Sequence, residues 1–404
     1  MNKQKIIITG KNYAFILGMA RSLKDENTEI IVLNTKKEKK NNFISIIKKA
    51  LQGSSIDSKS NCIDKYIITG NGEEKIIKTL INNYSKLDKK AIIIPLDDYT
   101  LSIFDSNYDQ LSKDFILPSI NKKQGEIVKL LNKNMQKEIA KKNDLFVSDG
   151  VLLKKEGKEY ININKVKYPV FTKPEISVKG NKTFMKKCDN KEELLQLLES
   201  IPKNFNCPII AEDYLSIEKE YAVVGYRFNE KVFIPGIIEM LKSGSGSQKG
   251  VTMIGIIHSP KNYESLINKL TNYVNTINYN GLFDFDIVEV NNKYYFSEMN
   301  LRFGASGYAF TKIGINIPKL YCANILNNEI NDSIKNDNYE KSFVNEKVLL
   351  DEYKNGYIGY KECIDYLKNT DYGFIRDQHD KKPFIHFKKQ LMIQRLKKII
   401  DLNK

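Results

Sequence analysis

Three polar residues of different chemistry occupy alternate positions in FSEMNLRFG, the stretch that covers residues 296–304. They are Glu298, Asn300 and Arg302, and hydrophobic residues stand between them. Alternate residues of a strand point to the same face of a sheet, so the pattern predicts a strand that presents all three to one ligand. Carboxylate and amide oxygens suit a hard cation such as Mg²⁺. A guanidinium binds a phosphate or a carboxylate with two hydrogen bonds.

A second acidic segment, FDFDIVEV at 283–290, precedes this stretch, and Asn291-Asn292-Lys293 separate the two. The spacing predicts a β-hairpin. We expect a three-residue loop centred on Asn292, which places Asp286 opposite Glu298, because a two-residue loop would pair Glu298 with Phe285 and mix the two faces. The expected polar face comprises Asp284, Asp286, Glu298 and Asn300, and the expected core face comprises Phe283, Phe285, Ile287, Tyr295, Met299 and Leu301. The alternative to a metal site is an acidic hairpin whose carboxylates pair with surface lysines.

The elements before this hairpin fall into two groups. In the first 100 residues, β-branched runs at 5–10, 29–35, 65–70 and 91–98 alternate with helical stretches such as 13–24 and 73–86. This alternation predicts βαβ units and a parallel sheet covered on both faces. The first strand is not followed by GxGxxG, so a dinucleotide site is not indicated.

Residues 122–142 have hydrophobic residues at helical spacing and predict one helix. From 160 to 300 the pattern is rich in strands and predicts an α+β domain with mostly antiparallel pairing. The predicted strands are 168–174, 206–215, 220–226, 231–240, 251–258, 283–290 and 294–300, with helices at 190–200 and 260–276. A basic amphipathic helix is predicted at 387–400 and is expected to dock on the body of the protein, with a membrane-surface helix as the alternative.

Composition limits the class of protein. The chain has 404 residues, and 64 Lys and Arg against 49 Asp and Glu give a net charge of +15. That charge suits a polyanionic partner, but no RNA-binding or zinc-finger pattern is present, and no specific nucleic acid is expected. No hydrophobic run approaches the roughly 20 residues of a transmembrane helix. The five cysteines are scattered and odd in number, which favours free thiols and a cytoplasmic location.

A family resemblance rests on two of these segments. EMNLR at 298–302, preceded by GLFDFD at 281–286, resembles the metal-binding hairpin of the ATP-grasp ligases. The resemblance implies that Asp286, Glu298 and Asn300 hold two Mg²⁺ ions, with Mn²⁺ as an alternative, and that Arg302 contacts the transferred phosphate. The sequence departs from the family at two positions. The first acid is often Glu and is Asp286 here, and the residue before the arginine is often Pro and is Leu301 here.

Three further segments resemble the family in the same order along the chain. LNKNMQKEIAKK and YPVFTKPEISVKGNK resemble the helix and the strand that supply phosphate-contacting lysines, which implies Lys133 and Lys173, with a closing loop at 177–182. Lys173 is also expected to act in catalysis beside Arg302. PIIAEDYLSIEKEYAVVG resembles the adenine-binding hinge. The implied roles there are contacts to the exocyclic amine by Glu212 and Asp213, backbone contacts by Tyr214 and Leu215, and ribose binding by Glu220.

The resemblance implies a Rossmann-like domain at 1–118, an ATP-grasp domain at 119–330 and an α-rich region at 331–404. Within the grasp, 119–208 is the expected small subdomain and 209–330 the large one. The implied activity is that of an ADP-forming carboxylate–amine ligase that uses ATP, Mg²⁺, a carboxylate and an amine and passes through an acyl phosphate.

Other expectations concern the substrate and the assembly. Arg227, Lys249 and Arg302 are expected to bind an anionic substrate group. NLRFGASGYA and GFIRDQHDKKPF resemble the D-aspartate-ligase-like branch that acts on cell-envelope precursors. The segment at 316–326 is a candidate for a homodimer contact. The alternatives are a carboxylate kinase or carboxylase with the same grasp, and a non-catalytic protein that binds nucleotides or nucleic acid.

Overall fold

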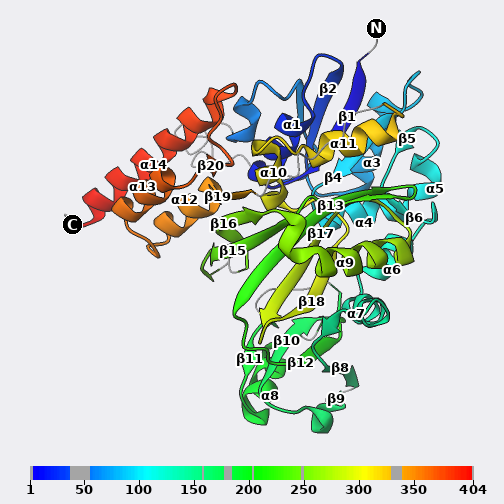
Figure 1. Ribbon diagram of the computed structural model, residues 1–404, viewed down its shortest axis with the longest axis vertical. Helices are drawn as coiled ribbons and strands as arrows, with labels where there is room; N and C mark the ends of the chain where they lie inside the picture. The colour runs from blue at the N-terminus through cyan, green and yellow to red at the C-terminus, as the bar shows by residue number, and fades with distance from the viewer. Residues whose placement is uncertain are drawn as a thin grey trace.

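The computed structural model describes residues 3–36, 55–156, 159–176, 184–202, 204–246, 250–328 and 339–402. Three β-sheets follow one another through the molecule, and helices cover their faces (Figure 1). The first sheet is parallel, the second is antiparallel, and the third and largest is mainly antiparallel. This is the predicted combination of an α/β part and an α+β part.

The first sheet has the strand order β3-β2-β1-β4-β5. Its strands are β1 (Gln4–Gly10), β2 (Thr28–Asn34), β3 (Lys65–Ile68), β4 (Ala91–Pro95) and β5 (Phe115–Ile116). Its helices are α1 (Tyr13–Leu23), η1 (Asp57–Lys59), α3 (Glu73–Tyr84), α4 (Asp98–Ser106) and α5 (Tyr108–Leu111). The β-branched runs are buried on both sides, because α1 packs on one face and α3 and α4 pack on the other. The side chain of Asp97 accepts the backbone N–H of Thr100, so α4 begins directly beyond β4 and starts at the carboxyl edge of the sheet.

The second sheet has the order β11-β10-β12-β8-β9 and lies at the lower end of Figure 1. Its strands are β8 (Gly150–Glu156), β9 (Glu159–Ile161), β10 (Val170–Pro174), β11 (Lys187–Cys188) and β12 (Ile209–Asp213), with η2 (Ile163–Lys165) and α8 (Lys191–Ser200) beside them. Val170, Ile209 and Ala211 face α8 in a hydrophobic core. Since side chains alternate along a strand, Lys173 and Glu212 point to the opposite face.

The third sheet has the order β20-β19-β16-β15-β13-β17-β18-β7, and β14 and β6 pair with β13 and β17. Its strands are β6 (Ser119–Ile120), β7 (Phe146–Val147), β13 (Lys219–Phe228), β14 (Lys231–Phe233), β15 (Ile237–Ser243), β16 (Thr252–His258), β17 (Tyr279–Val290), β18 (Lys293–Asn300), β19 (Glu340–Val344) and β20 (Tyr372–Gly373). Its neighbours are η6 (Pro260–Tyr263), α9 (Glu264–Ile277), η7 (Ala305–Gly307), α10 (Tyr308–Lys312) and α11 (Ile317–Ile325). One face packs on α9, and the other packs on α1, α10 and α11.

Two predicted elements are divided. Residues 122–142 form α6 (Glu126–Leu130) and α7 (Lys133–Lys142), because the side chain of Asn132 caps a new helix there. The predicted strand 231–240 is split into β14 and β15 around Pro235-Gly236, since proline cannot donate to a ladder.

The segment expected to form a dimer contact is buried within the chain. Ile317, Leu320 and Tyr321 of α11 belong to the core that α1 and β13 share. These side chains are therefore not available to a second copy.

The C-terminal region adds β19 and β20 to the third sheet and ends in three helices. These are α12 (Glu346–Lys354), α13 (Tyr360–Asn369) and α14 (Lys381–Leu402). Arg21 of α1 donates to Asp380 at 2.9 Å and ties the start of α14 to the first domain. Among the helices of the described ranges, none is both long and apolar enough to cross a bilayer.

Candidate active site

Strands β17 and β18 form the predicted hairpin, but its turn is shorter than expected. Val290 pairs with Lys293, so only Asn291 and Asn292 form the turn, with φ of 50° and 57°. The prediction of a three-residue loop is therefore wrong. Asparagine enters the left-handed region more readily than most residues, and two left-handed residues make the tight turn that suits a twisted hairpin.

A β-bulge restores the predicted pairing farther along the hairpin. The register shifts beyond Ile287, so that Ser297 is an extra residue and Asp286 lies opposite Glu298. Asp284 then lies opposite Asn300. The four polar residues share one face, as predicted, because the bulge offsets the shorter turn.

The same bulge changes the core face. Phe296 takes the buried position beside α9, whereas Tyr295, expected in the core, pairs with Val288 on the opposite face. There its ring lies 5.6 Å from that of Phe146. The prediction of Tyr295 as a core residue is wrong because the register before the bulge is shifted by one residue.

The two aspartates of β17 carry poorly compensated charge. Asp284 is buried, and its Oδ1 has no hydrogen-bond partner. Asp286 is half-buried and accepts a hydrogen bond from Nδ2 of Asn300 at 3.2 Å. Burial and the neighbouring Asp286 raise the pKa of Asp284 well above its usual value. Burial also raises the pKa of Asp286, although Arg302 counters it. The pair is suited to a cation that is not part of the protein.

Arg302 follows β18 and connects the hairpin to the first domain. Its Nε donates to Asp98 Oδ1 at 3.0 Å, and a terminal nitrogen donates to Asn300 Oδ1 at 3.1 Å. Burial disfavours the charged form, but Asp98 and Asp284 raise the pKa of Arg302. The guanidinium is therefore charged and fixed in place at the carboxyl edge of the first sheet.

Helix α7 turns a polar face toward the hairpin. Gln136 donates to the backbone oxygen of Met299 and accepts its N–H, both at 2.9 Å, which fixes α7 against β18. One turn earlier, Lys133 forms an ion pair with Glu298. Burial and the charge of Lys173 lower the pKa of Lys133 to about 7.

A second ion cluster joins α7 to the second sheet. Glu212 Oε1 lies 2.6 Å from Lys137 Nζ and 2.7 Å from Lys173 Nζ, and all three side chains are nearly buried. Lys137 also donates to the backbone oxygen and to Oγ of Ser148, which in turn donates to Glu212. Burial opposes ionisation of Glu212, yet Lys173 and Lys137 hold its pKa below the usual value. Burial lowers the pKa of Lys137 to about 8.

The remaining residues of the expected adenine hinge follow Glu212 at the end of β12. Asp213 and Tyr214 are exposed, and Leu215 is half-buried. Lys187 lies over the Tyr214 ring at 4.8 Å. Glu220 is half-buried on β13, and by strand alternation it lies on the same sheet face as Asp286. The hinge and the hairpin thus border the same region of the molecule.

Not every predicted residue is near this region. Arg227 is buried on the α9 face of β13, where it donates to Asn275 and Asn280 at 3.0 Å. On β13, Val224 pairs with Asp284 and Ala222 pairs with Asp286. Arg227 is an odd number of residues away from both, so its side chain points to the opposite face of the sheet. Lys249 and the loop at 177–182 lie outside the described residues.

Two residues of the site, Gln136 and Lys137, were missed from the sequence, and Asp98 was given no role there. Lys137 and Gln136 lie on the buried face of α7, and Asp98 contacts Arg302 from the first domain. Met135, one of the hydrophobic residues at helical spacing in 122–142, is 46 % exposed. A usable signal existed, since Lys133, Gln136, Lys137 and Ala140 follow helical i, i+3, i+4, i+7 spacing.

The donor set can be tested for a metal ion. Within the described ranges, no three Asp, Glu, His or Cys side chains are grouped as they would be around a metal. The hairpin instead supplies carboxylates from Asp286 and Glu298, the amide of Asn300, and the unpartnered oxygen of Asp284. This set fits a hard cation that brings other ligands with it, such as water or phosphate oxygens.

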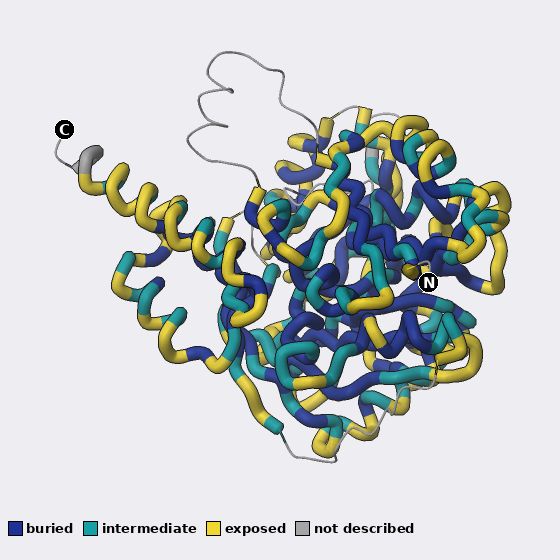
Figure 2. Tube along the Cα trace, turned by 90° about the horizontal axis from the view of Figure 1, so that it is seen from above, coloured by how far each residue is buried: buried dark blue, intermediate teal, exposed yellow. Residues whose placement is uncertain are grey.

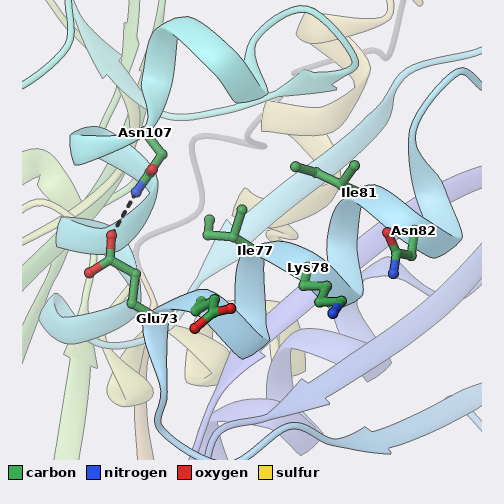
Figure 3. A pocket seen from close by; sticks show the side chains of 7 residues that line it. Glu73, Ile77, Lys78, Ile81, Asn82 and Asn107 are labelled. Carbon is green, nitrogen blue, oxygen red and sulfur yellow. Dashed lines mark hydrogen bonds between the residues drawn. The ribbon is translucent and has the colours of Figure 1, made fainter.

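A separate hollow lies over the outer side of α3 (Figure 3). Ile77 and Ile81 line it, and Asn107 donates to Glu73 at 2.9 Å along its edge. None of the clustered lysines and carboxylates borders it. We therefore assign it no part in the chemistry of the hairpin.

The structure has a parallel sheet followed by two largely antiparallel sheets, which is the arrangement expected for the ATP-grasp fold. Comparison with solved structures confirms that the chain has this fold. No protein-family model matches the sequence, and no curated protein sequence matches it.

Three of the similar solved structures illustrate the range of enzymes that share this fold. The biotin carboxylase domain of Hydrogenobacter thermophilus 2-oxoglutarate carboxylase has a TM-score of 0.64 at 15 % identity, over 85 % of this chain and 74 % of that one. N5-carboxyaminoimidazole synthetase from Staphylococcus aureus has a TM-score of 0.61 at 17 % identity, over 90 % and 88 %. L-amino acid ligase from Bacillus licheniformis has a TM-score of 0.56 at 14 % identity, over 85 % and 79 %. At this level of identity the likeness concerns the fold alone.

Proposed function

We propose that the protein is an ADP-forming ATP-grasp ligase that joins a carboxylate to an amine. The observation that carries the proposal is the convergence of Asp286, Glu298, Asn300 and Arg302 with the buried lysines of α7 and β10. Cationic lysines and oxygen ligands for a cation are what a triphosphate needs, and they meet where the second and third sheets adjoin. Two structures of the same fold, a carboxylase domain and a synthetase, were solved with MgADP and ADP.

In this proposal, Asp286, Glu298 and Asn300 would hold Mg²⁺, and the buried carboxylate of Asp284 lies on the same face of the hairpin. When bound, the metal offsets the charge that develops during phosphoryl transfer. In the structure, the ammonium group of Lys133 forms an ion pair with Glu298. A phosphate competes for Lys133, so nucleotide binding frees the carboxylate for the cation. The same competition draws Lys173 from Glu212, which retains Lys137 as a partner.

The chemistry then follows from the fixed charges. A carboxylate is a poor acceptor for an amine until ATP converts it to an acyl phosphate. Arg302, held by Asp98 and Asn300, would bind the acyl phosphate and then the oxyanion that forms when the amine attacks, before phosphate leaves and the amide remains. Asp213, Tyr214, Leu215 and Glu220 are assigned to the nucleoside, and Lys249 to an anionic substrate group.

The substrate pair is proposed to be an amino acid and a small-molecule or cell-envelope precursor, following the sequence resemblance. A cytoplasmic enzyme is proposed, since the five cysteines are all unpaired, which suits a reducing compartment.

A carboxylase of the same fold is the second candidate. It is favoured by the fold similarity to a carboxylase domain whose structure holds bicarbonate. Both candidates begin with phosphorylation of a carboxylate-like oxyanion by ATP. They differ in whether bicarbonate or an organic carboxylate supports the release of ADP.

The test is ADP release from ATP and Mg²⁺ with a panel of amino acids, envelope-precursor carboxylates and bicarbonate. We expect release that needs both a carboxylate and an amine, and a kcat about 10²–10³-fold lower in Glu298→Gln. Glu138→Gln, an exposed carboxylate on α7, is the matched control and should keep full activity. Release with bicarbonate alone would establish the carboxylase. A protein that does not bind ATP would overturn both candidates.

A further inference from the structure

Helix α14 carries hydrophobic side chains on two different faces. On the inner face, Phe387 and Leu391 are buried against the core formed with α12 and α13. Farther along the same face, the guanidinium of Arg395 lies 4.2 Å from the ring centre of Tyr360, and Lys398 donates to the backbone oxygen of Tyr353. The helix is therefore docked on the body, as predicted from its sequence.

The outer face has no such partner among the described residues. The exposed large hydrophobic side chains of the helix are Ile385, Met392, Ile393, Leu396 and Ile399, which are 47 %, 64 %, 40 %, 54 % and 46 % exposed. All of them except Ile393 stand at positions i, i+7, i+11 and i+14, and these four form one stripe along the helix. Scattered exposed hydrophobic residues are normal on a protein surface, but hydrophobic residues aligned along one side of a helix indicate an interaction surface. Figure 2 shows this helix projecting from the body of the molecule, with exposed residues along its length.

Basic residues border the stripe on both sides. The exposed lysines of the helix are Lys381, Lys382, Lys388, Lys389 and Lys397. In the described part of the chain, none of them has an ion-pair partner within 4.0 Å, in contrast to the paired Lys347 of α12. The acidic residue of the helix sequence is Asp401, close to its end. Lysine stems can lie along an apolar surface while their ammonium groups reach outward to anions.

We infer that this outer face binds an anionic lipid surface. A stripe of Ile, Met and Leu with lysines on either side matches the interface of a membrane, where apolar side chains enter the acyl boundary and lysines meet the headgroups. A second copy of the chain is disfavoured, because two such faces would bring their lysines together. Figure 1 shows that α14 and the second sheet lie at different ends of the molecule. Binding of α14 to a membrane therefore leaves the cluster of Glu212, Lys137 and Lys173 accessible. The inference does not depend on the proposed function.

Sedimentation of the full chain with lipid vesicles tests it. We expect binding to vesicles of phosphatidylcholine mixed with phosphatidylglycerol, weak binding to phosphatidylcholine alone, and loss of binding in high salt. Lysines near an anionic surface contribute about fivefold each, so Lys388→Gln with Lys389→Gln should lower the partition coefficient about 25-fold. Lys75→Gln with Lys78→Gln on α3 makes the same change of charge on another exposed helix and should bind as the wild type does.

A second pair of variants tests the apolar stripe. Met392→Asp with Leu396→Asp should abolish vesicle binding and keep the wild-type circular dichroism, since both side chains are exposed. Leu195→Asp, an exposed leucine of α8, is the control and should not change binding. Equal binding to both vesicle types, or none to either, would overturn the inference. So would a dimer in sedimentation equilibrium that Leu396→Asp converts to a monomer.

Discussion

Substitution of Lys137 is a direct test of the ion cluster that Glu212 forms with two lysines. The sequence had pointed to Lys133 and Lys173 but not to Lys137. In the structure, Lys137 and Lys173 share the buried carboxylate of Glu212. If Lys173 turns to a phosphate when a nucleotide binds, Lys137 is the cation that remains with Glu212. We predict that Lys137→Met lowers both the stability of the protein and its affinity for ATP.

The size of the stability loss follows from the contacts. Lys137 makes one ion pair at 2.6 Å and two hydrogen bonds to Ser148 at 2.8 and 2.9 Å. Removing one partner of a buried ion pair costs about 3–5 kcal/mol when the other is left alone. Lys173 stays beside Glu212, so we expect a loss of about 2 kcal/mol, in the range for hydrogen bonds to a charged group. Methionine keeps the unbranched stem, so lost packing contributes little.

Affinity for ATP should fall about tenfold, or about 1.4 kcal/mol, because Lys173 must then leave Glu212 without a cation. Urea denaturation gives the free energy of unfolding, and calorimetric titration with ATP gives the dissociation constant. Lys141→Met, one turn farther along α7 at a half-exposed position, is the control and should change stability by less than about 0.5 kcal/mol. Wild-type stability and ATP affinity in Lys137→Met would refute the shared role of the two lysines.

Five other substitutions probe the same site. Glu212→Gln should cost about 3 kcal/mol at pH 7. The pKa of Glu212 is lowered in the folded state, so its contribution to the free energy of unfolding is fully present above the usual pKa of 4.5 and is lost as the pH falls through the folded pKa. The free energies of unfolding of wild type and variant, measured with urea, should therefore converge in acid. Asp284→Asn should raise the free energy of unfolding by about 1–2 kcal/mol while reducing turnover, because it removes a buried charge with an unpartnered oxygen; a destabilised variant would contradict this. Asp98→Asn should lower kcat about tenfold and Arg302→Met about 10²–10³-fold, with the circular dichroism unchanged; equal effects would show that Asp98 does more than orient the guanidinium. Gln136→Ala should lower the unfolding temperature through a loss of about 2–4 kcal/mol, since it leaves both backbone groups of Met299 without partners; an unchanged unfolding temperature would show that α7 is held by other contacts.

Much of the fold could be read from local patterns. The β-branched runs of the first domain became buried parallel strands, because a strand covered on both faces needs hydrophobic side chains at nearly every position. The alternation in FDFDIVEV and in EMN placed Asp284, Asp286, Glu298 and Asn300 on one face of the hairpin. Side-chain direction in a strand is a local property, and so the polar face was predicted correctly.

Other features depended on contacts between distant segments. The hydrophobic spacing of 122–142 predicted a helix but not its rotation. Gln136 pairs with the backbone of Met299 in β18, and this contact turns the lysines of α7 inward. The guanidinium of Arg227 suits a substrate carboxylate, but side chains alternate along β13, and Arg227 points to the face of the sheet that packs on α9. Residue types and their spacing along the chain thus determined the kind of chemistry. Which charges meet was decided by strand register and helix rotation, because these are set by packing across the whole molecule.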